Sequence, residues 1–133
     1  MSESNEAARA VVDAAHRIAG AFDSHDVESL YAAHYQGPES TLIAQGGERV
    51  IGWALVQDEL EKRVNEFEVI RTKIDKPEVI LFGNLAVLTY EQHTNSRLHD
   101  IDFTWVGWVT DLYIQVEGRW LRIHHQASDR KKS

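Results

Sequence analysis

Residues 110–128 read TDLYIQVEGRWLRIHHQAS, and this segment decides the fold. Apolar residues recur on both sides of Glu117-Gly118, and a glycine between two such runs is typical of a turn that joins two strands. The segment therefore predicts an antiparallel hairpin whose strands cover residues 102–116 and 120–127.

The strand after the turn carries two adjacent imidazoles, His124 and His125. Successive side chains of a strand point to opposite faces of its sheet, so only one of the two can face the interior. Strict alternation predicts one face with Trp120, Arg122, His124 and Gln126, and the other with Leu121, Ile123, His125 and Ala127. A type I turn with a glycine bulge at Gly118 would bring Asp111 to the face of His125, and a slip of one residue would turn both outward.

The rest of the chain adds helices first and then further strands. Apolar residues recur every three or four positions in three segments, the spacing of a buried helix face. These predicted helices cover residues 6–22, 27–34 and 52–67, and Asp26 is expected to cap the second. Extended patterns predict further strands at 40–45, 48–51, 69–82 and 85–95, with a loop over 95–102. This order predicts an α+β fold, with three helices packed on a mainly antiparallel sheet of six strands.

Composition excludes several classes of protein. The chain has 133 residues, 43% of them hydrophobic, which is too rich for a disordered chain, and it lacks the run of about 18 apolar residues that crosses a membrane. Its formal net charge of -7 disfavours nucleic acid and anionic lipid as partners, and with no cysteine it has no thiol chemistry. We expect one cytoplasmic domain over residues 1–133 with mobile ends at 1–5 and 129–133, and no nucleic-acid or membrane partner.

Both faces of the predicted strand at 102–116 are apolar. One parity carries Phe103, Trp105, Val109 and Tyr113, and the other carries Val106, Trp108, Leu112, Ile114 and Val116. Three helices can cover only one face of such a sheet, so the second face needs a partner. A homodimer through this outer face is the resulting hypothesis, with Trp108 and Trp120 at the dimer surface.

Glycine and histidine motifs lie on both sides of the third predicted helix. Gly46-Gly47 is followed by Gly52-Trp53-Ala54-Leu55-Val56, and Thr110 is followed by Gly118-Arg119-Trp120 and Ile123-His124-His125-Gln126-Ala127-Ser128. With the order of elements, these motifs resemble the SnoaL-like branch of the nuclear transport factor 2 superfamily over nearly the whole chain. The resemblance implies a curved sheet that wraps the helices like a cone, with an apolar pocket at its open end. The superfamily includes isomerases, cyclases, hydrolases, kinase association domains and non-catalytic binders, so the motifs identify a fold rather than an activity.

The chain departs from the reaction motifs of two groups in this superfamily. Phe22 is the only aromatic residue of the first predicted helix, where ketosteroid isomerases carry a tyrosine. Val109 occupies the arginine position of the epoxide-hydrolase pattern Arg-x-Asp that would end at Asp111. Gln126 replaces the last histidine of the terminal motif, and Trp108 replaces a frequent arginine. The resemblance therefore implies neither of these two reactions.

The resemblance also suggests which residues enter the pocket. By similarity to the kinase association domains, whose pocket arginines lie at this parity, Asp111, His125, Tyr90 and Gln92 are expected inside. A carboxylate beside an imidazole in a dry pocket is a plausible acid/base pair, because burial raises the pKa of an aspartate and the carboxylate favours imidazolium. The alternative is that Asp111 satisfies a buried hydroxyl or N–H and that His125 is a core contact.

Three aromatic residues are further candidates for contact with a ligand. Trp53 at the start of the third helix and Trp105 on the presumed inner face could form the rim of the pocket and stack on a flat apolar ligand. Tyr31 could donate its hydroxyl into the pocket. The alternative for all three is an ordinary core or half-buried position.

No metal or cofactor is expected, because the seven histidines show no ligand spacing and the chain lacks dinucleotide, triphosphate and serine-hydrolase motifs. We expect a small, largely apolar ligand, neutral or cationic because position 111 is acidic. The expected activity is that of an isomerase, cyclase or dehydratase using Asp111 and His125. A non-catalytic ligand-binding or dimeric association module is the alternative.

Overall fold

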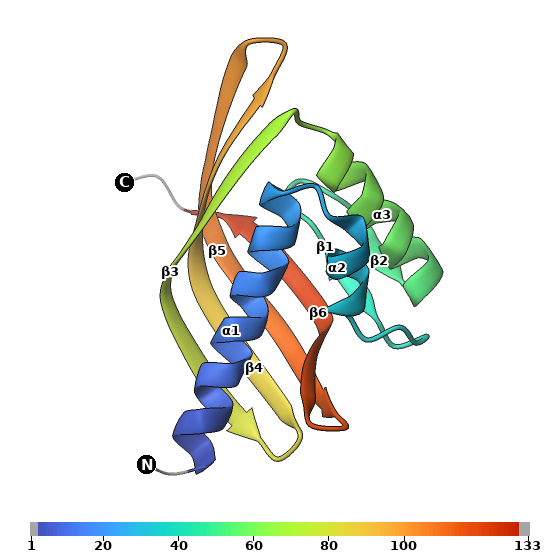
Figure 1. Ribbon diagram of the computed structural model, residues 1–133, viewed down its shortest axis with the longest axis vertical. Coiled ribbons are helices and arrows are strands. Elements are labelled where there is room, and N and C mark those ends of the chain that lie inside the picture. The colour runs from blue at the N-terminus through green and yellow to red at the C-terminus, as the bar shows by residue number, and fades with distance from the viewer. Residues whose placement is uncertain (1–2, 131–133) are drawn as a thin grey trace.

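Three helices lie against one face of a curved six-stranded sheet in the computed structural model, which describes residues 3–130 (Figure 1). The helices are α1 (Glu3–Asp23), α2 (Val27–Ala32) and α3 (Trp53–Asn65). The strands are β1 (Thr41–Ile43), β2 (Arg49–Ile51), β3 (Val69–Phe82), β4 (Leu85–Leu98), β5 (Ile101–Val116) and β6 (Arg119–Asp129). The predicted α+β class, with three helices on a mainly antiparallel sheet of six strands, is confirmed.

The two ends of the chain, predicted to be mobile, fall partly within these elements. Residues 3–5 belong to α1 and Asp129 ends β6, while residues 1–2 and 131–133 lie outside the described part of the chain. Within residues 3–130, no helix is both long enough and apolar enough to span a membrane.

The helices turn apolar stripes toward the sheet. Val11, Ala14 and Ile18 of α1 follow helical spacing and are at most 4% exposed. Asp26 caps α2 as predicted, because its carboxylate accepts a hydrogen bond from the Ser29 amide at 3.1 Å. The buried residues of α3 are Val56, Leu60 and Val64.

The strands form one sheet in the order β2-β1-β6-β5-β4-β3. All neighbours are antiparallel except β1 and β6, which run parallel. The four long strands, β3 to β6, follow one another as a meander that curves around α1 (Figure 1). The helices therefore cover the concave face, and no helix among residues 3–130 covers the other face.

The hairpin of β4 and β5 is longer than predicted. A loop is expected over 95–102, but β4 continues to Leu98 and β5 begins at Ile101. His99 and Asp100, between them, have φ of 51° and 64°, as a two-residue type I′ turn requires. Because this turn matches the twist of the strands, pairing extends to the tip, which projects beyond the helices (Figure 1).

The turn between β5 and β6 also differs from the prediction. Glu117 and Gly118 both have positive φ, 51° and 79°, which indicates a two-residue type I′ turn rather than a type I turn with a glycine bulge. Val116 consequently lies directly opposite Arg119. Continuing this register places Trp120 on the inner face of the sheet, where the sequence analysis does not expect it.

The extra residue of this hairpin lies within β6 instead of at the turn. Tyr113 pairs with Arg122 and Leu112 pairs with His124, so Ile123 is left over as a bulge. Strict alternation along β6 was therefore wrong: the inner face carries Trp120, Arg122, His125 and Ala127. Asp111 still lies opposite His125, as predicted, but for a different local reason.

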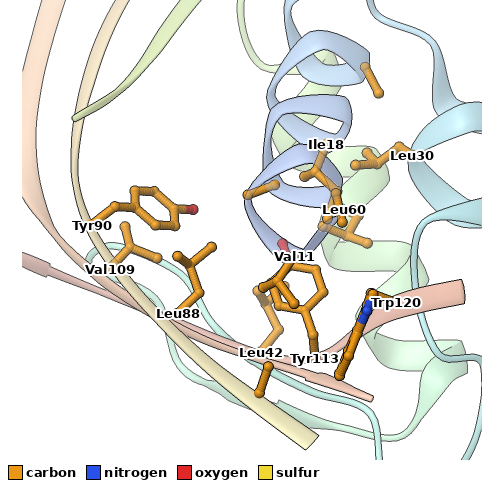
Figure 2. Close-up of a cluster of buried hydrophobic side chains, with 14 of the residues drawn as sticks. Val11, Ile18, Leu30, Leu42, Leu60, Leu88, Tyr90, Val109, Tyr113 and Trp120 are labelled. Carbon is orange, nitrogen blue, oxygen red and sulfur yellow. The ribbon is translucent and has the colours of Figure 1, made fainter. Parts of the chain in front are cut away.

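The hydrophobic core fills the space between helices and sheet (Figure 2). Ile18 of α1 and Leu60 of α3 belong to the same buried cluster as Leu88 and Val109 of the sheet. Trp120, predicted at the outer surface, is 6% exposed and belongs to this core. The position of Trp120 follows from the two-residue turn, which reverses the predicted parity of the first half of β6.

The outer face of the sheet exposes large apolar side chains. Ile80 and Phe82 of β3 are 58% and 62% exposed, and Trp108 of β5 is 45% exposed. Ile80 pairs with Val87 and Phe82 with Leu85, both on the face of β4 that points away from the helices. Trp108 is thus on the outer face, where the sequence analysis places it.

Candidate functional site

A cavity of about 400 Å³ lies between the helices and the concave face of the sheet. Phe22 of α1, Leu60 of α3 and Ile74 of β3 contribute apolar parts of its wall. Arg122 and His125 of β6 bring polar groups to the same wall. Further polar side chains line it too, from α3 and its C-terminal end and from the long strands: Arg63, Glu66, Thr72, Gln92, Thr94 and Ser96. A cavity of this size with apolar walls and several polar groups is typical of a small-molecule site.

Asp111 of β5 is the most deeply buried acidic group next to this cavity, with 0% exposure. Its Oδ1 lies 2.6 Å from Nδ1 of His125, directly across the β5–β6 pair. Its Oδ2 accepts a hydrogen bond from the Tyr90 hydroxyl at 3.1 Å and lies 3.9 Å from Nη1 of Arg122. The carboxylate is therefore held on both oxygens, as a buried charge requires.

The charges of Asp111 and His125 follow from this environment. Burial lowers the pKa of His125, the Arg122 guanidinium lowers it further, and Asp111 only partly offsets them. Burial acts to raise the pKa of Asp111, but His125, Arg122 and the hydrogen bonds outweigh it and hold that pKa below its usual value. At neutral pH the pair is therefore a carboxylate beside a neutral imidazole.

A neutral imidazole has one N–H, and its position decides what the ring can do. Nδ1 of His125 is 2.6 Å from the anionic Asp111 oxygen, so the proton lies on Nδ1 and is donated to the carboxylate. Nε2 then carries a lone pair and bonds no group among residues 3–130. Because His125 lines the cavity, Nε2 is the ring nitrogen available to a ligand.

Arg122 and His34 complete the polar end of the cavity, and sequence reasoning missed both. Arg122 is 4% exposed, with Nη1 3.1 Å from Nδ1 of His125 and Nε donating to Nε2 of His34 at 3.0 Å. A charged residue between apolar neighbours in a predicted strand was the available signal. The two-residue turn, which local sequence did not reveal, is what points Arg122 inward.

His34 is the buried acceptor that holds Arg122. Its Nδ1 donates to the carbonyl oxygen of Leu30 at 2.6 Å, one helical turn earlier, which leaves Nε2 to accept from Arg122. Burial and the neighbouring guanidinium place the pKa of His34 well below its usual value. His34 is therefore neutral, and both of its ring nitrogens are used, by Leu30 and by Arg122.

The other predicted ligand-binding residues divide into two groups. Tyr90, Gln92 and Trp105 line the cavity, although Tyr90 directs its hydroxyl to Asp111. Tyr31 and Trp53 lie outside the lining and pack on each other, with ring centroids 5.8 Å apart. These two residues lie away from the cavity because both are placed where α2 meets the start of α3.

Among residues 3–130, one group of side chains has metal-ligand character. Potential ligand atoms of Asp75, Glu91 and His93 lie within 4.8 Å of one another, on the outer face of the sheet. The Glu91 carboxylate already contacts His93 at 2.8 Å and Arg130 at 3.0 Å. A metal ion bound here would have to compete with the Arg130 guanidinium for the Glu91 carboxylate, so the cluster fits an ion-pair network better than a metal site.

No protein-family model and no curated protein matches the sequence significantly. Solved structures do match the fold. A proposed dehydratase of the NTF2-like family from Streptomyces avermitilis has a TM-score of 0.90 at 15% identity, over 97% of this chain and 99% of that one. A proposed scytalone dehydratase from Novosphingobium aromaticivorans has a TM-score of 0.87 at 15% identity, over 98% and 89%.

A third similar structure comes from a different functional class. The CamKII hub homology domain of Chlamydomonas reinhardtii has a TM-score of 0.75 at 18% identity, over 94% of this chain and 99% of that one. Proposed dehydratases and a hub domain thus share this architecture. The element order, the curved sheet and these similarities lead to one conclusion: the chain has the nuclear transport factor 2-like fold.

Proposed function

We propose that this protein binds a small, largely apolar molecule in the cavity and catalyses proton transfer on it without a cofactor, as a dehydratase or isomerase does. One observation carries the proposal: Asp111, fully buried, holds Nδ1 of His125 at 2.6 Å, while Nε2 of the same ring is open to the cavity. A neutral imidazole that is oriented by a carboxylate is a general base.

The proposed reaction begins when Nε2 of His125 removes a proton from a carbon of the ligand. Asp111 stabilises the imidazolium that results, because its carboxylate lies 2.6 Å from Nδ1. The imidazolium then returns the proton, either to a hydroxyl group that leaves as water or to another carbon of the ligand. The first outcome is a dehydration and the second is an isomerisation.

The test is exchange of carbon-bound hydrogen in D2O with 2-tetralone, a bicyclic ketone with acidic C–H bonds. The wild-type protein is expected to accelerate deuterium uptake at the carbon next to the carbonyl, measured by proton NMR. His125→Gln should lose this acceleration. His124→Gln is the matched control, because His124 lies on the other face and bonds Thr41 at 2.6 Å. Equal rates for the wild type and His125→Gln would refute catalysis by this ring.

A second candidate function is that of an association module. The similarity to the CamKII hub homology domain and the exposed apolar outer face favour it. We infer that the outer face pairs with a second copy of the chain, since the same kind of residue faces solvent on β3 and β5. In this case the cavity would bind ligand without turnover, and 2-tetralone would bind while deuterium uptake stayed at the uncatalysed rate.

A further inference from the structure

A second hollow, of about 290 Å³, lies between α1 and the start of β6. It shares no lining residue with the cavity described above. The hollow stays open because small residues face one another across it: Ala10 and Ala14 on α1, Ala33 after α2, and Gly118 in the turn before β6. We call this hollow the α1–β6 groove.

Trp120 brings a buried hydrogen-bond donor to the α1–β6 groove. Its side chain is 6% exposed and lies at one side of the buried cluster in Figure 2. Its indole N–H has no acceptor among residues 3–130. The fully enclosed side-chain atoms without a partner in that range are Oδ1 of Asp23 and the Tyr113 hydroxyl, so the indole nitrogen is not sealed in the core and opens onto the groove. Since buried indole N–H groups usually have a partner, this one points to an acceptor held in the groove.

Two arginines bring further donors to the groove, one from each side. Arg17 of α1 forms no hydrogen bond or ion pair with any residue of the range 3–130, so all five of its N–H groups are available. Arg119 of β6 donates from Nη2 to the carbonyl oxygen of Ala32 at 3.1 Å, which holds the side chain in place and leaves Nε and Nη1 unused. Guanidinium groups are the side chains best suited to bind oxyanions.

The lining of the groove is positive although the protein carries a net charge of -7. Arg17 and Arg119 contribute two positive charges and Asp13 contributes one negative charge, which leaves a net charge of +1. Glu117, next to Gly118 in the turn, is exposed and does not line the groove. Asp13 opposes an anion, so the removal of its charge should strengthen anion binding.

We propose that the α1–β6 groove binds a phosphate group, either free or as the monoester of a small molecule. Arg17 and Arg119 would hold it from the two sides, and the indole N–H of Trp120 would donate to one of its oxygens. Donors on three separate side chains favour phosphate over carboxylate, because a phosphate group offers at least three acceptor oxygens and a carboxylate offers two. The proposal is independent of the function proposed for the cavity, since the two sites have no residue in common.

Nitrogen-15 NMR of the tryptophan side chains tests this proposal. The chain has four tryptophans, so Trp120 gives one of four indole signals, which is identified through its backbone assignment. Titration with inorganic phosphate at constant pH and ionic strength should move the Trp120 indole proton downfield until the site is saturated. Arg17→Gln should weaken binding about 10-fold, the effect of losing a hydrogen bond to a charged group. Asp13→Asn should strengthen it about 2- to 5-fold, as expected for one nearby exposed charge.

Two variants are controls. Arg9→Gln removes an exposed arginine of α1 that lies outside the groove, and it should leave the affinity for phosphate unchanged. His125→Gln changes the cavity and should also bind phosphate like the wild type, so a failure of the proposed catalysis leaves this site intact. A parallel titration with phenyl phosphate distinguishes the two forms of the ligand: tighter binding than inorganic phosphate supports a monoester, and weaker binding supports the free ion.

Four results would overturn the proposal. An unchanged Trp120 signal would mean that solvent is the partner of its N–H. A shift of the Trp105 signal alone would place the phosphate in the cavity, which Trp105 lines. Equal weakening by Arg9→Gln and Arg17→Gln would indicate general attraction to positive charge. Acetate binding as tightly as phosphate would exclude the preference for a phosphate group.

Discussion

At the residue scale, the site is a chain of buried groups in which each fixes the next. Leu30 fixes the tautomer of His34, His34 accepts from Arg122, and Arg122 lies against the pair formed by Asp111 and His125. Buried charges are tolerated only when they are paired and hydrogen-bonded, so the removal of one member affects the others. Because the groups are coupled, changes of pH and conservative substitutions at one member test the roles of the others.

Asp111→Asn tests the carboxylate. The amide can still accept from Nδ1 of His125, but it cannot stabilise imidazolium, so we expect deuterium uptake by 2-tetralone to slow by about 100-fold. Asp111 also raises the pKa of His125, so the acid limb of the pH–rate profile should move to lower pH in the variant. An unshifted limb with an unchanged rate would remove Asp111 from the mechanism.

His34 predicts how stability depends on pH. Its pKa is lowered well below the usual value in the folded state, so below about pH 6.5 the unfolded chain binds a proton that the folded chain does not. Stability should therefore fall as pH decreases from 6.5, by up to about 1.4 kcal/mol per pH unit for this residue.

Urea unfolding at several pH values measures this dependence. In His34→Gln, the fall in stability on acidification should be shallower, whereas His16→Gln, which alters an exposed imidazole of α1, should run parallel to the wild type. Parallel curves for the wild type and His34→Gln would contradict the assignment of His34 as a buried neutral acceptor.

At the element scale, the hairpin of β5 and β6 determines which side chains reach the cavity. The two-residue turn points Trp120 and Arg122 inward, and the bulge at Ile123 restores the parity that brings His125 to Asp111. A bulge changes the face of the sheet to which the following side chains point, which is why bulges are frequent next to active sites. Close packing along β5 depends on Gly107, which has no side chain.

Gly107→Ala should destabilise the protein by about 1–3 kcal/mol. A Cβ at this position would lie 2.3 Å from the backbone oxygen of Ser128 and 2.2 Å from Cζ2 of Trp105, so β6 would have to shift. Gly20→Ala is the matched control, because no atom lies within 4 Å of its added Cβ. On α1 it should stabilise by about 0.5–1 kcal/mol. Thermal unfolding of both variants measures the difference, and equal melting temperatures would contradict the packing described for β5.

At the scale of the whole molecule, the sheet has two unlike faces. The concave face packs on the helices and encloses the cavity, while the outer face exposes Ile80, Phe82 and Trp108. Phe82 pairs with Leu85, which is 38% exposed, so exposed apolar residues gather at the end of the outer face where β3 and β4 meet. Exposed apolar clusters mark interaction sites in soluble proteins. We therefore expect the outer face, and not the helical side, to mediate self-association.

Ile80→Asp should weaken the proposed homodimer, because it places a charge on the apolar outer face. Sedimentation velocity at micromolar concentration is the measurement, and a shift toward the monomer is the expected result. Leu55→Asp is the matched control: Leu55 is 56% exposed, similar to 58% for Ile80, but lies on α3. A monomeric wild type, or dissociation by the Leu55 variant alone, would contradict this interface.

Local sequence was sufficient for most elements. Apolar periodicity predicted all three helices within a few residues, Asp26 acts as the predicted cap, and alternation predicted the six strands. The tip at His99 and Asp100 was missed because neither residue is a glycine, although both adopt positive φ. Turn chemistry of this kind depends on the strand pairing around it and is weakly encoded in the local residues.

The sequence by itself determined the class of fold and the extent of the helices and long strands. It placed Asp111 beside His125 only through an assumed turn that the structure does not have, and placed both inside only through the resemblance. Apolar periodicity and turn residues are local features of the sequence, so they predict helices and strands without knowledge of the packing. Only the tertiary structure decided that Trp120 and Arg122 point inward, that His34 reaches Arg122 from another element, and that Tyr31 and Trp53 lie outside the cavity. The physical reason is that the two-residue turn and the bulge at Ile123 set strand register, and register depends on pairing with distant residues.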